Sequence, residues 1–123
     1  MHYLQQFLKY MKETQERRES EMKLLFDREQ YDNYQAVLVT EMVTKIRLKL
    51  QEGGIEGSQL QDLTAAIGSS ITSLLDDTTI IQDGDTEAHP YLTFVSDNDE
   101  LIHIGENAYT HEFLFDALKK VFG

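Results

Sequence analysis

The sequence predicts an α+β fold in which three N-terminal helices precede a small antiparallel sheet and a C-terminal helix. The first 52 residues contain neither glycine nor proline and are rich in strong helix formers. From about residue 78, apolar residues recur at every second position, as in strands, instead of every third or fourth, as in helices. A final segment returns to helical spacing. Because 123 residues fall within the usual size range of one domain, residues 1–123 are read as a single domain.

The N-terminal half is expected to contain two helices that meet at Asp27. The apolar residues of the first helix recur on one face: Leu4, Phe7, Leu8 and Met11, continuing weakly to Met22, Leu25 and Phe26. Residues 12–21 are almost wholly polar, which predicts a helical segment that projects beyond the core. Asp27 followed three residues later by Gln30 is typical of a helix N-terminus, so a second helix is predicted to start there. One continuous helix over residues 2–51 is the alternative.

A third helix is predicted after the glycine-rich segment 53–57. Ser58 and Gln61 have the spacing of a capping box, in which two side chains satisfy free backbone N–H groups. The apolar stripe of this helix continues to about Leu75, and two aspartates follow it. Negative charge is unfavourable at a helix C-terminus. The third helix is therefore expected to stop near Leu75.

The sheet is predicted from a hairpin over residues 91–104. Two β-rich runs flank the turn-forming segment 96–100. Strand alternation places four apolar residues on one face of this hairpin: Leu92, Phe94, Ile102 and Ile104. Residues 78–82 form a possible third strand. Thr110 is the predicted N-cap of the final helix, which carries two lysines in its last turn.

The net charge of −11 is concentrated in the second half of the chain. Residues 1–52 contain nine basic and nine acidic residues, whereas residues 53–123 contain 13 acidic residues and only two basic ones. No lysine or arginine lies between Lys49 and Lys119. A nucleic-acid-binding protein needs a basic surface, and an anionic membrane repels an acidic one. In the first half, the Arg17-Arg18 pair is flanked by glutamates. Neither nucleic acid nor a membrane is therefore predicted as a partner.

The composition favours a soluble, cytoplasmic protein. The chain contains no cysteine, which excludes disulfides, thiolate catalysis and sulfur-ligated metal sites. Glutamines interrupt the apolar residues at the N-terminus, so this segment does not resemble a signal peptide. No apolar run approaches the roughly 20 residues needed to cross a bilayer.

No motif in the sequence specifies a metal or another cofactor. His111-Glu112 begins like a zincin helix, but Phe115 occupies the position of the second histidine ligand. The acidic residues of segment 83–87 match the first, third and fifth positions of an EF-hand loop, but the required glycine and final glutamate are absent. No catalytic residue is assigned. A small hydrolase or metal-dependent enzyme that uses His103, His111 and Glu112 is kept as an alternative.

The leading hypothesis is a non-enzymatic protein-binding module whose acidic half docks a basic partner, as an inhibitor, an immunity-type protein or a secretion chaperone does. Complementary charge accelerates encounter and selects partners. The residues assigned to the docking surface are Asp76, Asp77, Asp83, Asp85, Glu87, Asp97, Asp99, Glu100 and Tyr109. Tyr109 is expected to be exposed as an aromatic anchor. A homodimer is also expected, because a short sheet has exposed edges that favour pairing with a second copy. A structural subunit without a basic partner is the further alternative.

Overall fold

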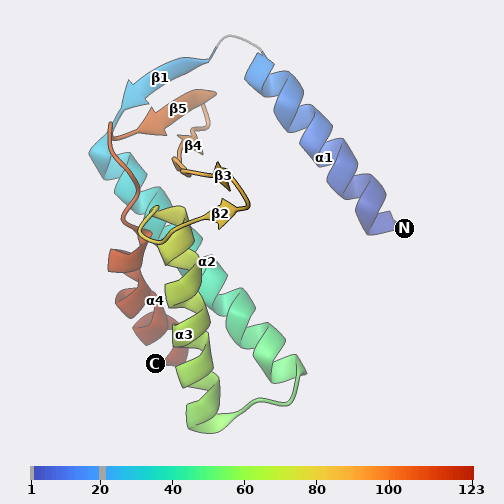
Figure 1. Ribbon diagram of the computed structural model, residues 1–123, viewed down its shortest axis with the longest axis vertical. Helices are drawn as coiled ribbons and strands as arrows, with labels where there is room; N and C mark the ends of the chain where they lie inside the picture. Colours follow the sequence, from blue (N-terminus) through green and yellow to red (C-terminus); the bar gives the residue numbers. More distant parts are fainter. Residues whose placement is uncertain (1, 20–21) are drawn as a thin grey trace.

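The computed structural model describes residues 2–19 and 22–123, with side chains described for residues 3–14 and 22–123 (Figure 1). The Arg17-Arg18 pair therefore lies outside the described side chains. The elements in chain order are α1 (His2–Glu19), β1 (Lys23–Phe26), α2 (Arg28–Glu52), α3 (Gly57–Leu75), β2 (Gln82–Asp83), β3 (Thr86–Glu87), β4 (Phe94–Val95), β5 (Glu100–His103), the 3-10 turn η1 (Thr110–Phe113) and α4 (Leu114–Phe122). Helices α2, α3 and α4 pack together, and β1, β4 and β5 lie at one end of α2 (Figure 1). The predicted α+β fold is confirmed.

The main sheet has three strands in the order β1-β5-β4 and is mixed rather than antiparallel. β4 and β5 form the predicted hairpin, with Phe94 opposite Ile102. The third strand is β1, which runs parallel to β5 with Leu25 opposite Ile102. The helical interpretation of Leu25 and Phe26 was therefore wrong, and so was the assignment of the third strand to residues 78–82. A short run of three apolar residues fits either a helix or a strand, and here pairing with β5 decides for the strand.

Helix α2 begins where the sequence predicts. The side chain of Asp27 accepts a hydrogen bond at 3.0 Å from the backbone N–H of Gln30, which satisfies one free donor of the first turn. The extended backbone of Asp27 separates β1 from α2. The alternative of one continuous helix over residues 2–51 is therefore excluded.

Helix α3 ends at Leu75 as predicted, but it starts without the predicted capping box. Its N-cap is Glu56, which makes no capping hydrogen bond through its side chain, and Ser58 already lies within the helix. In its middle, Gly68 packs against the helix α4 residue Leu114: a Cβ added to Gly68 would lie 2.9 Å from Cδ1 of Leu114. The absence of a side chain at Gly68 therefore lets α3 and α4 approach closely.

Two clusters of buried residues form the core. One joins α2 to the sheet and consists of Tyr31, Ile102, Ile104 and Ala108, with Leu92 and Phe94 packed against it. The other joins α2 to α4 and contains Val39, Val43, Leu114 and Ala117. The predicted apolar face of the hairpin is thus confirmed. Tyr31 is fully buried, and its hydroxyl donates to the carbonyl of Leu92 at 2.7 Å. This burial raises the pKa of Tyr31 to about 12.

Helix α1 lies apart from the other helices (Figure 1). Its large apolar side chains are exposed, at 48–86% of their full accessible surface: Tyr3, Leu4, Phe7, Leu8, Tyr10 and Met11. Most of the stability of a helix in a protein comes from packing of its apolar face rather than from helix propensity. The apolar face of α1 is therefore a candidate contact surface.

Candidate protein-binding surface

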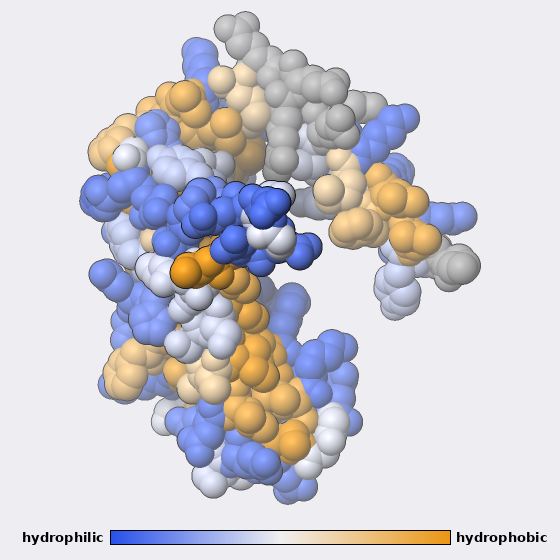
Figure 2. All heavy atoms as spheres, viewed as in Figure 1, coloured by the Kyte–Doolittle hydropathy of each residue, from blue (hydrophilic) through white to orange (hydrophobic). Residues whose placement is uncertain are grey.

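A short acidic hairpin projects between the end of α3 and the main sheet. β2 and β3 are antiparallel, with Asp83 opposite Thr86, and every residue from 82 to 89 is exposed. Gly84 has a φ of +59°, which glycine adopts at no steric cost and which closes the tight turn. Asp83, Asp85 and Glu87 are therefore presented to solvent on one compact hairpin. In Figure 2 hydrophilic residues cover this part of the molecule, above an apolar strip along α2 and α3.

His89 ties the acidic hairpin to the end of α3. Its Nδ1 lies 2.9 Å from a carboxylate oxygen of Asp77, and its Nε2 lies 3.5 Å from an oxygen of Glu87. The hydrogen bond with Asp77 raises the pKa of His89 above its usual value of 6.5. Protonation of His89 thus places a positive charge between these two carboxylates and reduces the negative charge of the hairpin. The side chain of Asp77 is only 16% exposed, so Glu87 is the more accessible of the two acids.

Asp76 does not contribute to an exposed acidic surface, contrary to its assignment. It is 4% exposed, and its carboxylate accepts hydrogen bonds from the backbone N–H and the hydroxyl of Thr110 and from the backbone N–H of His111. These donors belong to η1, the turn that precedes α4. Thr110 was predicted to cap the last helix with its own side chain, but the cap is Asp76, which is distant in sequence.

The acids of the β4–β5 turn form a second group. Asp97 and Asp99 are exposed, and Glu100 is half-buried at the start of β5. The side chain of Ser96 shapes this turn by accepting hydrogen bonds from the N–H groups of Asn98 and Glu100, both at 3.2 Å. Lys23 on β1 is paired in register with Glu100 and lines the same shallow hollow as Asp99. Lys23 therefore partly offsets the negative charge here, whereas at the β2–β3 hairpin it is protonation of His89 that reduces the negative charge.

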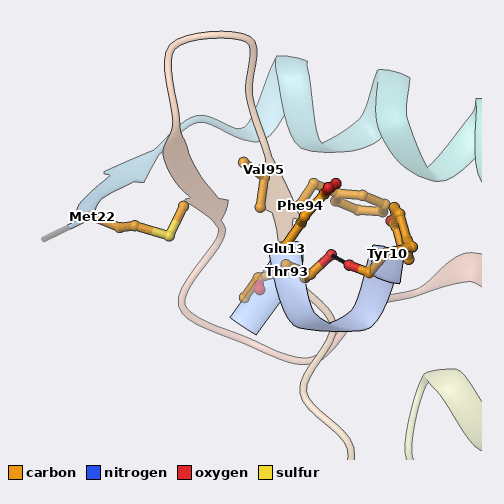
Figure 3. Close-up of a pocket in the computed structure, with 7 residues that line it drawn as sticks. Tyr10, Glu13, Met22, Thr93, Phe94 and Val95 are labelled. Carbon is orange, nitrogen blue, oxygen red and sulfur yellow. Dashed lines mark hydrogen bonds between the residues drawn. The ribbon is translucent and has the colours of Figure 1, made fainter. Parts of the chain in front are cut away.

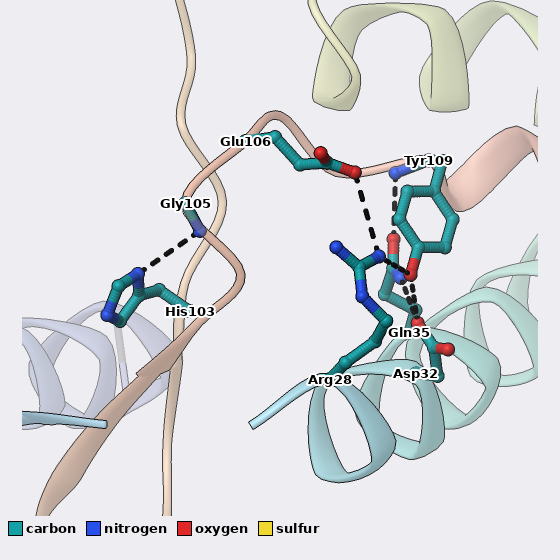
Figure 4. A network of polar contacts seen from close by, with 7 residues as sticks. All are labelled: Arg28, Asp32, Gln35, His103, Gly105, Glu106 and Tyr109. Carbon is teal, nitrogen blue, oxygen red and sulfur yellow. Dashed lines mark hydrogen bonds and ion pairs between the residues drawn. The ribbon is translucent and has the colours of Figure 1, made fainter. Parts of the chain in front are cut away.

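Tyr109 is half-buried in a polar network and is not the freely exposed anchor that the sequence suggested (Figure 4). Its hydroxyl donates to Asp32 and accepts from Arg28 at 3.0 Å, while its backbone N–H donates to the fully buried side chain of Gln35 at 2.9 Å. Burial and the bond to Asp32 raise the pKa of Tyr109. Arg28 also lies 3.6 Å from Glu106. The network joins the start of α2 to the segment that leads into η1.

Three of these residues, Asp32, Gln35 and Arg28, were missed by sequence reasoning. Asp32 and Gln35 are three residues apart, which places both on one face of a helix. That spacing is the only signal the sequence offered, since the partner Tyr109 lies more than 70 residues away along the chain.

The two histidines of the enzymatic alternative have separate partners, and its third residue, Glu112, is exposed. Nδ1 of His103 accepts from the backbone N–H of Gly105 at 3.2 Å, and its ring packs edge-on against Phe26. Nδ1 of His111 lies 3.0 Å from the hydroxyl of Thr72. Within the described part of the chain, no three histidine, aspartate or glutamate side chains are arranged to hold a metal ion.

A hollow of about 380 Å³ separates α1 from the main sheet (Figure 3). Its lining residues are Tyr10, Glu13, Thr14, Met22, Thr93, Phe94 and Val95. Apolar and polar groups are mixed in this lining, and Figure 3 shows no converging set of hydrogen-bond donors. Among the side chains that the structure describes, those lining the hollow do not form the converging set of polar groups that is typical of an active site.

Among the described residues, every helix is too short or too polar to cross a lipid bilayer. The chain matches no protein-family model, and no match was found among the curated proteins or the solved structures.

Proposed function

We propose that this chain is a non-enzymatic, cytoplasmic protein-binding module that docks a basic protein partner through its acidic β2–β3 hairpin. The observation that carries the proposal is the exposure of Asp83, Asp85 and Glu87 on one short hairpin within a stretch, from Leu50 to Leu118, that contains no lysine or arginine. Close carboxylates repel one another by about 1 kcal/mol at contact distances in water. A cationic surface relieves this repulsion when it binds.

The hairpin is also suited to reach into a concave partner. It projects from the end of α3 with every residue from 82 to 89 exposed, and β2 and β3 pair only with each other. Exposed charges mainly accelerate association and select the partner, whereas buried apolar anchors supply most of the affinity. Ile80, which is 78% exposed and lies two residues before β2, is an apolar side chain that can serve as such an anchor.

The docking surface proposed here is narrower than the set assigned from sequence. Asp76 and Tyr109 are excluded because their polar groups are engaged inside the molecule. Asp97, Asp99 and Glu100 belong to a separate turn next to Lys23. The core of the proposed surface is the hairpin with Asp77 at its base.

The test compares two variants of equal charge. In the first, the three hairpin acids become Asp83→Asn, Asp85→Asn and Glu87→Gln. In the matched control, Glu56→Gln, Asp62→Asn and Asp116→Asn neutralise three exposed acids elsewhere. Each tagged protein is incubated with native lysate, and the captured protein with the highest isoelectric point is then purified for titration. We expect the wild type and the control to bind it with equal affinity and the hairpin variant to bind at least tenfold more weakly.

Salt dependence provides the second measurement. Surface electrostatics are screened over about 8 Å at physiological salt and about 3 Å at 1 M. We expect the affinity to fall steeply between these concentrations. An affinity that is unchanged by salt, or that falls equally in both triple variants, would contradict docking through the hairpin. A stoichiometric metal that is lost on His111→Ala would instead favour the enzymatic alternative.

A further inference from the structure

One edge of the main sheet is open and apolar. β1 pairs with β5 on one side only, and no other described strand lies on its other side. The backbone N–H of Asp27 donates to the carbonyl of His103. Because backbone groups of a strand point alternately to its two sides, those of Leu25 also face β5, while those of Leu24 and Phe26 face outward. The described part of α1 approaches β4, the opposite edge of the sheet.

The side chains of β1 are exposed to an unusual degree for an apolar strand. Leu24 is 69% exposed, Leu25 is 36% exposed and Phe26 is 60% exposed. Sheet edges in natural proteins are commonly protected by charges, proline or covering segments. β1 carries only Lys23 at its start, and Asp27 follows its end. This edge therefore has the properties of a strand-pairing site.

The pattern of β1 is self-complementary in the antiparallel direction. Read from Lys23 to Asp27, it is a cation, three apolar residues and an anion, with Leu25 at the centre. A two-fold axis at Leu25 would place each Lys23 opposite Asp27 of the second copy. Such an axis brings the same surface of both subunits together, as in most homodimers. The charge complementarity points to a second copy of this chain rather than to an unrelated strand.

We propose that two copies of this chain associate through antiparallel pairing of their β1 strands about a two-fold axis at Leu25. Leu24 of each copy then faces Phe26 of the other, and each of these pairs exchanges two backbone hydrogen bonds. The two Leu25 residues form the central pair without hydrogen bonds, where side chains lie closest. The association joins two three-stranded sheets into one continuous sheet.

The outward backbone groups restrict the register. A two-fold axis between two adjacent residues would place a residue whose backbone groups face the second copy opposite a residue whose backbone groups face β5. No ladder of hydrogen bonds between the two β1 strands could then form. An axis at Leu24 or at Phe26 would permit hydrogen bonds but would move Lys23 away from Asp27 of the second copy. Only the axis at Leu25 combines hydrogen bonds from both outward residues with both charge pairs.

Cysteine cross-linking tests this register directly, because the chain has no native cysteine. In the proposed dimer the two Leu25 positions have Cα atoms about 4.5 Å apart, within the range of about 4.4–6.8 Å that a disulfide requires. The two Leu24 positions are diagonal neighbours at about 7–8 Å, beyond that range. We expect Leu25→Cys to give a covalent dimer under mild oxidation, and Leu24→Cys and the α2 control Leu48→Cys to remain uncross-linked. Cross-linking that is strongest at Leu24, or equal at all three positions, would overturn the proposed pairing.

Charge variants test the same contact without oxidation. The dimer is measured by sedimentation analysis at about 0.15 M salt, which screens repulsion between the two acidic copies beyond about 8 Å. We expect Lys23→Asp to raise the dissociation constant of the dimer about tenfold. Adding Asp27→Asn should recover part of this loss, because asparagine keeps the N-cap of α2 but removes the repelling charge. Circular dichroism checks that each variant is folded. A wild-type protein that stays monomeric would overturn the proposal. A dimer whose affinity is unchanged by Lys23→Asp would also overturn it, because the second copy would then bind elsewhere, such as on the apolar face of α1.

Discussion

The carboxylate of Asp76 accepts hydrogen bonds from both the backbone N–H and the hydroxyl of Thr110, at 2.7 and 2.6 Å. Asp76 immediately follows α3, and Thr110 begins the turn that leads into α4. The negative charge that is unfavourable at the end of its own helix therefore stabilises the beginning of another one. This single side chain joins two of the three packed helices.

Loss of the Asp76 carboxylate should destabilise the protein strongly. Asp76→Ala leaves the two buried donors of Thr110 and the partly buried N–H of His111 without an acceptor, and each unpaired buried group costs about 1–3 kcal/mol. We expect the free energy of unfolding in urea to fall by roughly 3 kcal/mol. The control Asp62→Ala removes an exposed acid from α3 and should change the free energy of unfolding by less than about 0.5 kcal/mol. Equal small effects of the two substitutions would show that the Asp76 contact does not stabilise the fold.

The hydroxyl of Tyr31 should stabilise the contact between α2 and the sheet. Tyr31→Phe keeps the packing against Phe94 but removes the donor to the carbonyl of Leu92. We expect a loss of about 1–2 kcal/mol of unfolding free energy in urea at pH 7. The packing control Val37→Ala, on the exposed side of α2, should cost less.

The Tyr31 hydroxyl also predicts a dependence on high pH. Its pKa is about 12 in the folded protein, against about 10 in the unfolded chain. A raised pKa stabilises the fold fully below pH 10, and this contribution is lost as the pH rises from 10 towards 12. Wild-type stability should therefore decline over this range, and Tyr31→Phe should decline less. Parallel declines of the two proteins would contradict the assignment to Tyr31.

His89 should make stability depend on pH from about pH 6.5 upwards. Its pKa is raised above 6.5 by the hydrogen bond with Asp77, so its contribution is present below about pH 6.5 and is lost as the pH rises through the raised value. We expect the wild type to exceed His89→Gln in thermal midpoint at about pH 5.5, with the difference vanishing at alkaline pH. A difference that grows with pH would have the wrong sign for this contact.

Tyr109 should contribute to folding and not to partner binding. Tyr109→Phe removes the donor to Asp32 and the acceptor for Arg28, which should lower the unfolding free energy by about 1 kcal/mol. The same variant should bind the basic partner with unchanged affinity, because the proposed docking surface lies on the β2–β3 hairpin. A large loss of affinity without loss of stability would restore Tyr109 as an interface anchor.

Sequence periodicity predicted the helices and the β4–β5 hairpin well because their signals are local. The break at Asp27 follows from its own side chain, which caps α2 by accepting a hydrogen bond from the backbone N–H three residues later. The apolar face of the hairpin follows from strict alternation around Phe94 and Ile102. Such patterns lie within a few residues of one another, so no distant contact is needed to interpret them.

The candidate site was predicted only in part, because charge along a sequence does not specify exposure. Asp76 and Asp77 are adjacent acids, yet Asp76 is buried beneath η1 whereas Asp77 bonds to His89 at the surface. Asp83, Asp85 and Glu87 were assigned together, and the structure presents them together because a local turn at Gly84 holds them.

The sequence alone determined the helical segments, the α+β class, the hairpin and the restriction of the net negative charge to the second half of the chain. Only the tertiary structure decided that residues 23–26 form a strand, that Asp76 caps a helix 34 residues away, and that Tyr109 turns inward. The physical reason is that a short apolar strand, a buried carboxylate and a tyrosine hydroxyl each depend on partners supplied by distant segments. Those partners come within reach only when the helices and the sheet have packed together.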